Sequence, residues 1–184
     1  QLSEKYPGVL MGFGSVDPHR DDAAKEVDRA ADLGLKGLKF HPTMQVFDPG
    51  DERFYPIYER MQERGLVALF HTGTCGIGAG TPGAGGTKIR NSHPGFLDAV
   101  GADFPGVTWI AAHFGWPWYP ETLAYALHKA NVWIELSGWA PGYLPDDVKR
   151  EAGKRLNERT LFGSDYPFIP LDRWFAEFED LGYD

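Results

Sequence analysis

Short apolar segments alternate along this chain with longer amphipathic ones. The short segments are nearly continuous in apolar, β-branched or aromatic residues, and they predict six strands at about 9–16, 35–40, 66–72, 107–114, 132–138 and 160–164. The longer segments predict helices at 20–33, 54–64, 95–104, 121–130, 146–156 and 172–181. Regular alternation of strand and helix predicts βα units around a parallel sheet.

The position of polar residues separates the two folds that share this pattern. Four of the predicted strands end in ionisable side chains, namely Lys39 with His41, then His71, His113 and Asp165. A barrel builds its catalytic face from several strand ends, whereas a doubly wound sheet gathers its ligand at one switch point. We therefore expect an α/β fold of the (β/α)8 TIM-barrel type. Six units are two short of a closed barrel, so about the first two βα units are expected upstream of this chain.

Composition narrows the class of partner. The formal net charge of -8 and the pI near 5.2 argue against a nucleic-acid or anionic-membrane binder and favour a small-molecule substrate. No apolar run reaches the roughly 18 residues of a membrane span. A single cysteine cannot form an internal disulfide, which favours a cytoplasmic protein. No linker or repeat divides the sequence, so residues 1–184 are predicted to form one partial barrel domain.

The three most informative side chains are His71, His113 and Asp165. A single histidine at a strand end is more often a satisfied residue at the edge of the core than a ligand. Recurrence at three equivalent strand ends reverses that preference. A buried carboxylate needs a partner or a metal, and histidine with aspartate is a ligand set that suits Zn²⁺ or a similar divalent ion.

Four short motifs give the sequence a family resemblance. They are Gly37-Leu-Lys-Phe-His-Pro42, His71-Thr-Gly73, Ala112-His-Phe-Gly115 and Phe162-Gly-Ser-Asp-Tyr-Pro167. In this order they resemble the amidohydrolase-related proteins of the amidohydrolase superfamily, and the aminocarboxymuconate-semialdehyde decarboxylase group is the most similar. The resemblance extends through nearly all of the chain.

The resemblance implies a mononuclear metal centre. His71 and Asp165 would be ligands to one divalent ion, Zn²⁺ with Mn²⁺ as the alternative. His113 would be the catalytic histidine beside a metal-bound water, and Asp165 would also accept the proton of that water. The family's His-x-His or Glu-x-His pair is absent from this chain, so either those ligands lie upstream or the metal has been lost. A homodimer is expected for this kind of enzyme.

Other polar and aromatic residues are candidates for substrate binding. Lys39 and His41 could hold an anionic group of the substrate, although a structural ion pair would explain Lys39 equally well. Trp116 leads a group of aromatic residues after His113 that could line an aromatic-substrate site. The alternative for this group is packing of a loop against the barrel.

The glycine-rich segment 76–86 contains a superficial dinucleotide-binding pattern. Pro82 interrupts it and no helix begins at its end, so we reject that interpretation. A mobile loop over the barrel mouth fits better, with Lys88 and Arg90 available to a substrate carboxylate or phosphate. Solvated loop charges are an equally good explanation of these two residues.

Three functions remain open at this level. The leading hypothesis is metal-dependent hydrolysis of a small organic acid, ester, thioester or activated carbon–carbon bond. The first alternative is non-oxidative decarboxylation of an aromatic or unsaturated carboxylic acid. The second is a non-catalytic barrel that serves as a binding scaffold. We also expect the 184-residue chain alone to be inactive, because it would lack part of the metal's ligand set.

Overall fold

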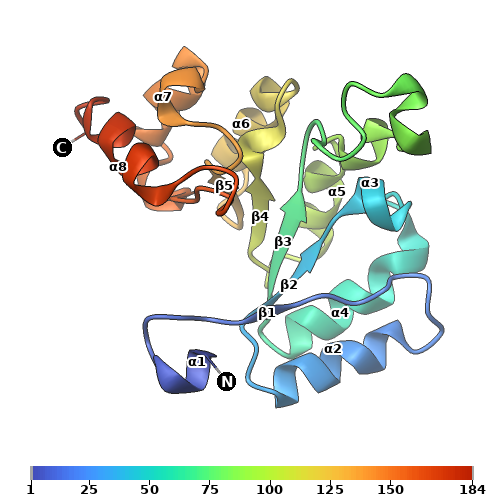
Figure 1. The fold of residues 1–184 in the computed structure, drawn as a ribbon. Coiled ribbons are helices and arrows are strands. Elements are labelled where there is room, and N and C mark those ends of the chain that lie inside the picture. The colour runs from blue at the N-terminus through green and yellow to red at the C-terminus, as the bar shows by residue number, and fades with distance from the viewer. Residues whose placement is uncertain (1, 184) are drawn as a thin grey trace.

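A six-stranded parallel sheet forms the centre of the molecule (Figure 1), and the computed structural model describes residues 2–183. Its strands are β1 (Phe13–Gly14), β2 (Gly37–Phe40), β3 (Val67–His71), β4 (Trp109–Ala112), β5 (Val132–Glu135) and β6 (Thr160–Leu161). Each strand pairs in parallel with the next one along the chain. This order has no switch point, so it is the wall of a (β/α)8 barrel and not a doubly wound sheet.

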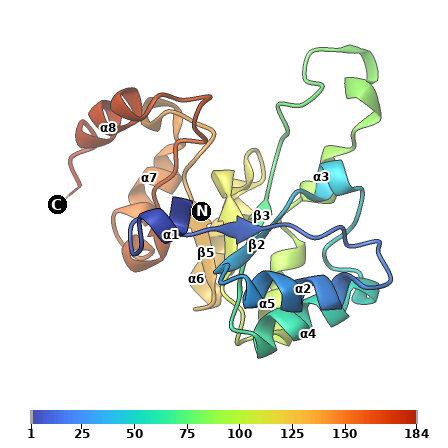
Figure 2. The same ribbon diagram turned by 60° about the horizontal axis from the view of Figure 1, so that its bottom comes forward.

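Every strand is followed by at least one helix, and several helices that are neighbours along the chain pack on one another. The helices are α1 (Leu2–Lys5), α2 (Ala23–Asp32), α3 (Pro42–Gln45), α4 (Tyr55–Glu63), α5 (Phe96–Asp103), α6 (Tyr119–His128), α7 (Asp146–Ala152) and α8 (Leu171–Glu179). Helix α2 packs on α4, α5 on α6 and α6 on α7 (Figure 2). Asp28 of α2 accepts from Arg60 and Arg64 of the α4 segment at 2.7 and 2.8 Å, which fixes the first of these contacts.

The structure confirms every predicted strand and helix but changes some lengths. The two outermost strands, β1 and β6, have two residues each because each pairs with a neighbour on one side only within residues 2–183. Helix α3 was not predicted. Neither were the 3₁₀ turns Glu52–Phe54, Pro82–Gly86, Ile89–Ser92, His113–Gly115, Pro141–Tyr143 and Asn157–Arg159, which are too short to show a period in the sequence.

The two faces of the sheet have opposite character. Successive residues of a strand point to opposite faces, so Phe40 and Phe70 lie on the helix side and Lys39 and His71 on the other. The Phe40 and Phe70 rings stack at 4.8 Å in the core between sheet and helices. His71 is in register with Ala112, which is in register with Glu135. The non-helical face therefore carries ionisable groups at the carboxyl ends of the strands.

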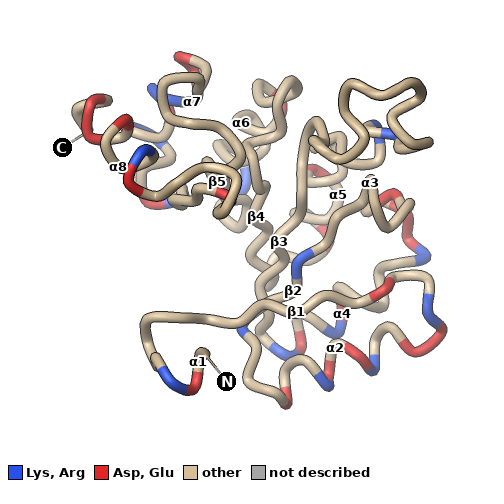
Figure 3. The backbone as a smooth tube through the Cα atoms, viewed as in Figure 1, with Lys and Arg blue, Asp and Glu red and all other residues tan. Residues whose placement is uncertain are grey.

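Charge is distributed over the outer helices. Acidic and basic residues are interspersed along α2 and α4, and further charges lie on α7 and α8 (Figure 3). The strands at the centre of the sheet carry few charged residues in the same view. Among residues 2–183 no helix has both the length and the apolar character needed to cross a membrane.

Trp109 of β4 is the first position where we predict a large loss of stability. Its side chain is fully buried and contacts the rings of Tyr58 at 5.1 Å and Phe70 at 5.9 Å. We expect Trp109→Ala to lower the free energy of unfolding by about 3–5 kcal/mol, because the cavity cannot be refilled by neighbouring rings. Urea unfolding followed by circular dichroism measures the change. Trp116→Ala is the matched control, since Trp116 is 37% exposed, and equal losses in both variants would contradict the assigned core.

Candidate active site

A pocket of about 670 Å³ opens at the carboxyl ends of the strands. It brings together the predicted strand-end residues, which are Lys39, His41, His71, His113 and Asp165. The remaining lining residues are Thr74, Cys75, Gly76, Ile77, Gly138, Trp139 and Phe168. The pocket therefore combines a group of ionisable side chains with an apolar and aromatic wall.

Three imidazole rings lie next to one another in this pocket. The rings of His41 and His71 stack at 3.9 Å, and those of His71 and His113 meet at 4.7 Å with a 62° angle. Burial is the main reason that the pKa of His41 falls to about 4 and that of His71 to about 2. Neighbouring positive charge lowers both pKa values further. Both rings are therefore neutral at physiological pH, which is the form that binds metals.

His41 and His71 each keep one ring nitrogen that makes no hydrogen bond to the described residues. His71 Nε2 lies 3.0 Å from the carbonyl oxygen of Thr74, and since a carbonyl only accepts, Nε2–H donates and Nδ1 keeps its lone pair. His41 Nδ1 is buried and has no hydrogen-bond partner among residues 2–183. Neutral imidazole nitrogens of this kind are among the ligands that divalent ions take in proteins.

His113 is held by a chain of hydrogen bonds that begins at Glu135. Ser137 Oγ donates to Glu135 Oε2 at 2.6 Å and lies 2.9 Å from His113 Nδ1. A hydroxyl has one proton, so with Glu135 ionised Ser137 must accept from His113 Nδ1–H. The bare nitrogen of His113 is then Nε2, which leaves it able to take a proton. We call these three residues the Glu135–Ser137–His113 relay.

Two glycines allow the relay to pack closely. A Cβ atom on Gly138, whose φ is +79°, would lie 2.7 Å from His113 Nδ1. A Cβ on Gly163 would lie 1.5 Å from Glu135 Oε1. Any larger residue at either position would displace the side chain that it meets.

Lys39 and Glu135 are a partly compensated pair of buried charges. Burial lowers the pKa of Lys39, while the carboxylates of Glu135 and Asp165 act in the opposite direction. Burial raises the pKa of Glu135, opposed by the hydrogen bond from Ser137 and by the charge of Lys39. Such opposed shifts are typical of functional sites, although structural ion pairs produce them as well.

Backbone strain is concentrated at the same strand ends. His113, Phe114 and Asp165 have φ angles of 66°, 42° and 59°, in the left-handed region that non-glycine residues seldom adopt. Each such residue lowers the free energy of unfolding by about 1–3 kcal/mol, and the conformation persists only where the surrounding structure enforces it. The strain at His113 and Asp165 aims two strand-end side chains into the pocket.

Three of the predicted substrate-binding residues lie outside the pocket lining. Lys88 precedes the 3₁₀ turn Ile89–Ser92 and Arg90 lies within it, and both are exposed. The ring of Trp116 lies 5.0 Å from that of Trp139. Their roles stay predictions. The sequence interpretation missed Glu135 and Ser137. Glu135 is the one charged residue within the apolar segment 132–138, and that contrast could have revealed it.

This fold and this pocket define a class of protein, the barrel enzymes that carry an ionisable site at the carboxyl ends of their strands. The family model described as Amidohydrolase matches residues 1–182. The chain belongs to this amidohydrolase family. No curated protein matches it.

Solved structures share the fold. An uncharacterized TIM-barrel protein from Bordetella bronchiseptica is 26% identical, with a TM-score of 0.84 over 100% of this chain and 63% of its own. 5-Carboxyvanillate decarboxylase from Sphingomonas paucimobilis is 20% identical, with a TM-score of 0.72 over 98% of this chain and 65% of its own. Dihydroxybenzoic acid decarboxylase from Polaromonas sp. JS666, with bound manganese and the inhibitor 2-nitroresorcinol, is 18% identical. Its TM-score is 0.69 over 99% of this chain and 66% of its own. The chain thus spans about two thirds of the length of these proteins.

Proposed function

We propose that this protein is a metal-dependent decarboxylase of an aromatic carboxylic acid that bears a hydroxyl group. The observation that carries the proposal is the pocket, in which ionisable groups face an apolar wall of Ile77, Trp139 and Phe168. Such a wall suits a flat ring, and the ionisable groups suit a carboxylate. The similarity to aromatic-acid decarboxylases supports this alternative above hydrolysis, which was the leading hypothesis from the sequence.

The residues present fit a divalent ion. We propose that His71 and Asp165 hold it, because His71 offers a neutral imidazole with a free nitrogen and Asp165 a carboxylate in the same pocket. When bound, the ion would supply positive charge that orients the substrate's oxygen atoms and stabilises charge developing on them. Manganese is the first candidate, since it is bound in several of the similar structures.

The chain's own side chains supply positioning and proton transfer. Lys39 contributes a buried positive charge that attracts the substrate carboxylate. Trp139 and Phe168 hold the ring and keep water from the carbon that loses carbon dioxide. That carbon must take up one proton as the carbon–carbon bond breaks. We assign the transfer to His113 Nε2, the nitrogen that the relay leaves unbound, which takes the proton of the substrate's hydroxyl group and passes it to the carbon.

Metal removal tests the proposal on the natural protein. With Mn²⁺ present we expect release of carbon dioxide from a hydroxybenzoate or carboxyvanillate, measured together with loss of the substrate's ultraviolet absorbance. Chelation should remove most of the activity, because the ion stabilises the developing charge, and Mn²⁺ should restore it. His71→Asn should not be restored, whereas His128→Asn should, since His128 is an exposed residue of α6.

The product distinguishes this reaction from hydrolysis. An ester, thioester or lactone cleaved by the metal-loaded protein, with no carbon dioxide from any aromatic acid tested, would overturn the proposal. It would reinstate the hydrolase hypothesis. A folded protein that binds no divalent ion would instead favour the scaffold.

A further inference from the structure

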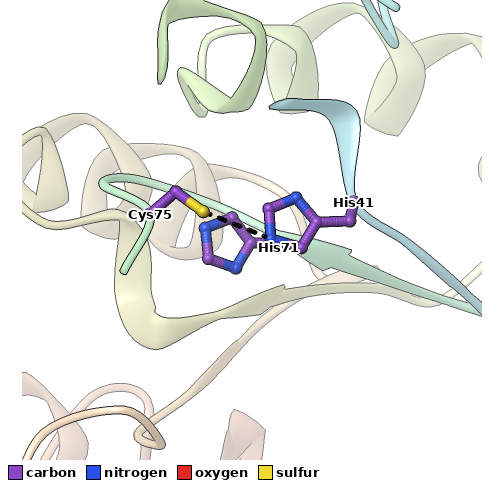
Figure 4. A group of neighbouring side chains, drawn as sticks. All are labelled: His41, His71 and Cys75. Atoms are coloured by element: carbon purple, nitrogen blue, oxygen red, sulfur yellow. Dashed lines mark hydrogen bonds between the residues drawn. The ribbon is translucent and has the colours of Figure 1, made fainter. Parts of the chain in front are cut away.

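Cys75, His41 and His71 form a cluster that the proposed reaction does not use as a set. The Cys75 sulfur and the two imidazoles gather at one point of the pocket (Figure 4). Their ligand atoms all lie within 4.8 Å of one another, which no other such group within residues 2–183 achieves. We propose that these three residues form a second metal site, the thiolate site, which takes a divalent ion with affinity for sulfur, such as Zn²⁺ or Co²⁺.

The spacing of the cluster is close to that of a tetrahedral zinc site. Zinc–nitrogen and zinc–sulfur bonds at tetrahedral angles place the two ligand atoms about 3.5 Å apart. Cys75 Sγ and His41 Nε2 are 3.7 Å apart. The widest separation, at most 4.8 Å, closes with side-chain movements of roughly an ångström.

The three side chains have donor atoms to spare. Within the described part of the chain, the Cys75 sulfur is the one hydrogen-bond contact of the His41 ring, and the other ring nitrogen is buried without a partner. His71 Nδ1 is left free by the bond from Nε2 to Thr74. Cys75 is itself buried, and its sulfur accepts from the backbone N–H of Ile77 at 3.3 Å, a contact that stabilises negative charge on sulfur. On binding, the thiol releases its proton to solvent and the sulfur–metal bond forms without a redox change.

Ligand chemistry separates the thiolate site from the proposed catalytic site. The catalytic set contains the oxygen ligand Asp165, which suits Mn²⁺, whereas a thiolate selects Zn²⁺ or Co²⁺. The positive charge of Lys39 disfavours a cation beside His41, whereas the negative charge of the Asp165 carboxylate favours one. Because His71 belongs to both sets, an ion in the thiolate site withdraws His71 from the catalytic site. The sharing of His71 is the one point at which this inference rests on the proposed function.

Cobalt titration of the natural protein tests the thiolate site directly. A cysteine thiolate bound to Co²⁺ gives a charge-transfer band in the near ultraviolet, and because Cys75 is the one cysteine of residues 1–184, its replacement shows whether the band comes from this site. We expect the band to saturate at one equivalent and Zn²⁺ to abolish it by displacement. Cys75→Ser should lose the band and bind Zn²⁺ at least roughly tenfold more weakly, the lower bound expected for loss of a ligand.

Two further variants separate failure of the thiolate site from failure of the decarboxylase proposal. His41→Asn should weaken the band, while Asp165→Asn should retain it and lose Mn²⁺ binding. Cobalt binding without a charge-transfer band, in folded protein verified by circular dichroism, would overturn the thiolate site and leave the decarboxylase proposal intact. A band in the cobalt titration, together with no decarboxylation in a separate assay of the natural protein with Mn²⁺ alone, would do the reverse.

Discussion

Replacing His113 by glutamine is expected to lower kcat of the natural protein by about 10²–10⁴-fold, the usual contribution of a positioned general acid or base. His113 lies in the pocket with its Nδ1 held by Ser137, so its Nε2 is the group assigned to proton transfer. Glutamine preserves polarity and approximate size but cannot carry a proton between atoms. The measurement is the initial rate of carbon dioxide release at saturating substrate and Mn²⁺.

The pH profile gives this prediction a second readout. Burial lowers the pKa of His113 from its ordinary value of 6.5, so the ring stays neutral below pH 6.5 and gains its proton at lower pH. The acidic limb of the rate profile should therefore lie below pH 6.5 in the unaltered protein and disappear in the variant. His128→Gln, on the exposed side of α6, should leave both rate and profile unchanged. A His113→Gln rate within a factor of about three of the unaltered protein would exclude His113 from proton transfer.

The sequence predicted the strand ends well because two independent signals coincide there. His71 and His113 each follow an apolar run, and a buried parallel strand brings the residue after it to the catalytic edge. Lys39 was found in the same way. Residues that meet these side chains from other segments gave no comparable signal, since contact in space is not encoded in spacing along the chain.

Cys75 and Ser137 illustrate that limit. The sequence interpretation assigned no role to Cys75, yet its sulfur lies 3.7 Å from His41, which is 34 residues away. Ser137 reaches His113 across 24 residues. Conversely, Lys88 and Arg90 follow a glycine-rich segment that could in principle close over the pocket, but they are exposed in the folded chain.

The reaction type was the other property that the residues alone could not decide. Hydrolysis and decarboxylation both use a divalent ion, a carboxylate and a histidine, so His71, His113 and Asp165 are compatible with either. The apolar wall formed by Trp139 and Phe168 supports the proposed aromatic substrate, and the product of the reaction is what separates the two hypotheses. The sequence prediction of Zn²⁺ rested only on the types of ligand residue. Mn²⁺ suits a ligand set that contains a carboxylate equally well.

Glu135→Gln is expected to reverse the tautomer of His113 and to lower kcat by about 10–100-fold, the cost of losing a buried hydrogen bond to a charged group. Oε1 of residue 135 accepts from the Ser137 backbone N–H at 3.0 Å, and Oε2 accepts from the His113 backbone N–H at the longer distance of 3.4 Å. Because the shorter contact needs an oxygen most, the amide nitrogen of glutamine takes the place of Oε2. It then donates to Ser137 Oγ, whose own proton turns toward His113 Nδ1. The ring must protonate at Nε2 instead, which removes the base from the pocket.

Nitrogen NMR of the imidazole ring distinguishes this effect from general damage to the fold. The unaltered protein should show His113 protonated at Nδ1, and Glu135→Gln should show it protonated at Nε2. Ser137→Ala removes only the hydroxyl acceptor, and since the pKa of His113 is raised by a hydrogen bond with the Ser137 backbone, this variant should leave the acidic limb in place. Ser137→Thr keeps the hydroxyl and should retain the tautomer of the unaltered protein. An unchanged tautomer in Glu135→Gln, with the protein folded, would show that the relay does not set the protonation of His113.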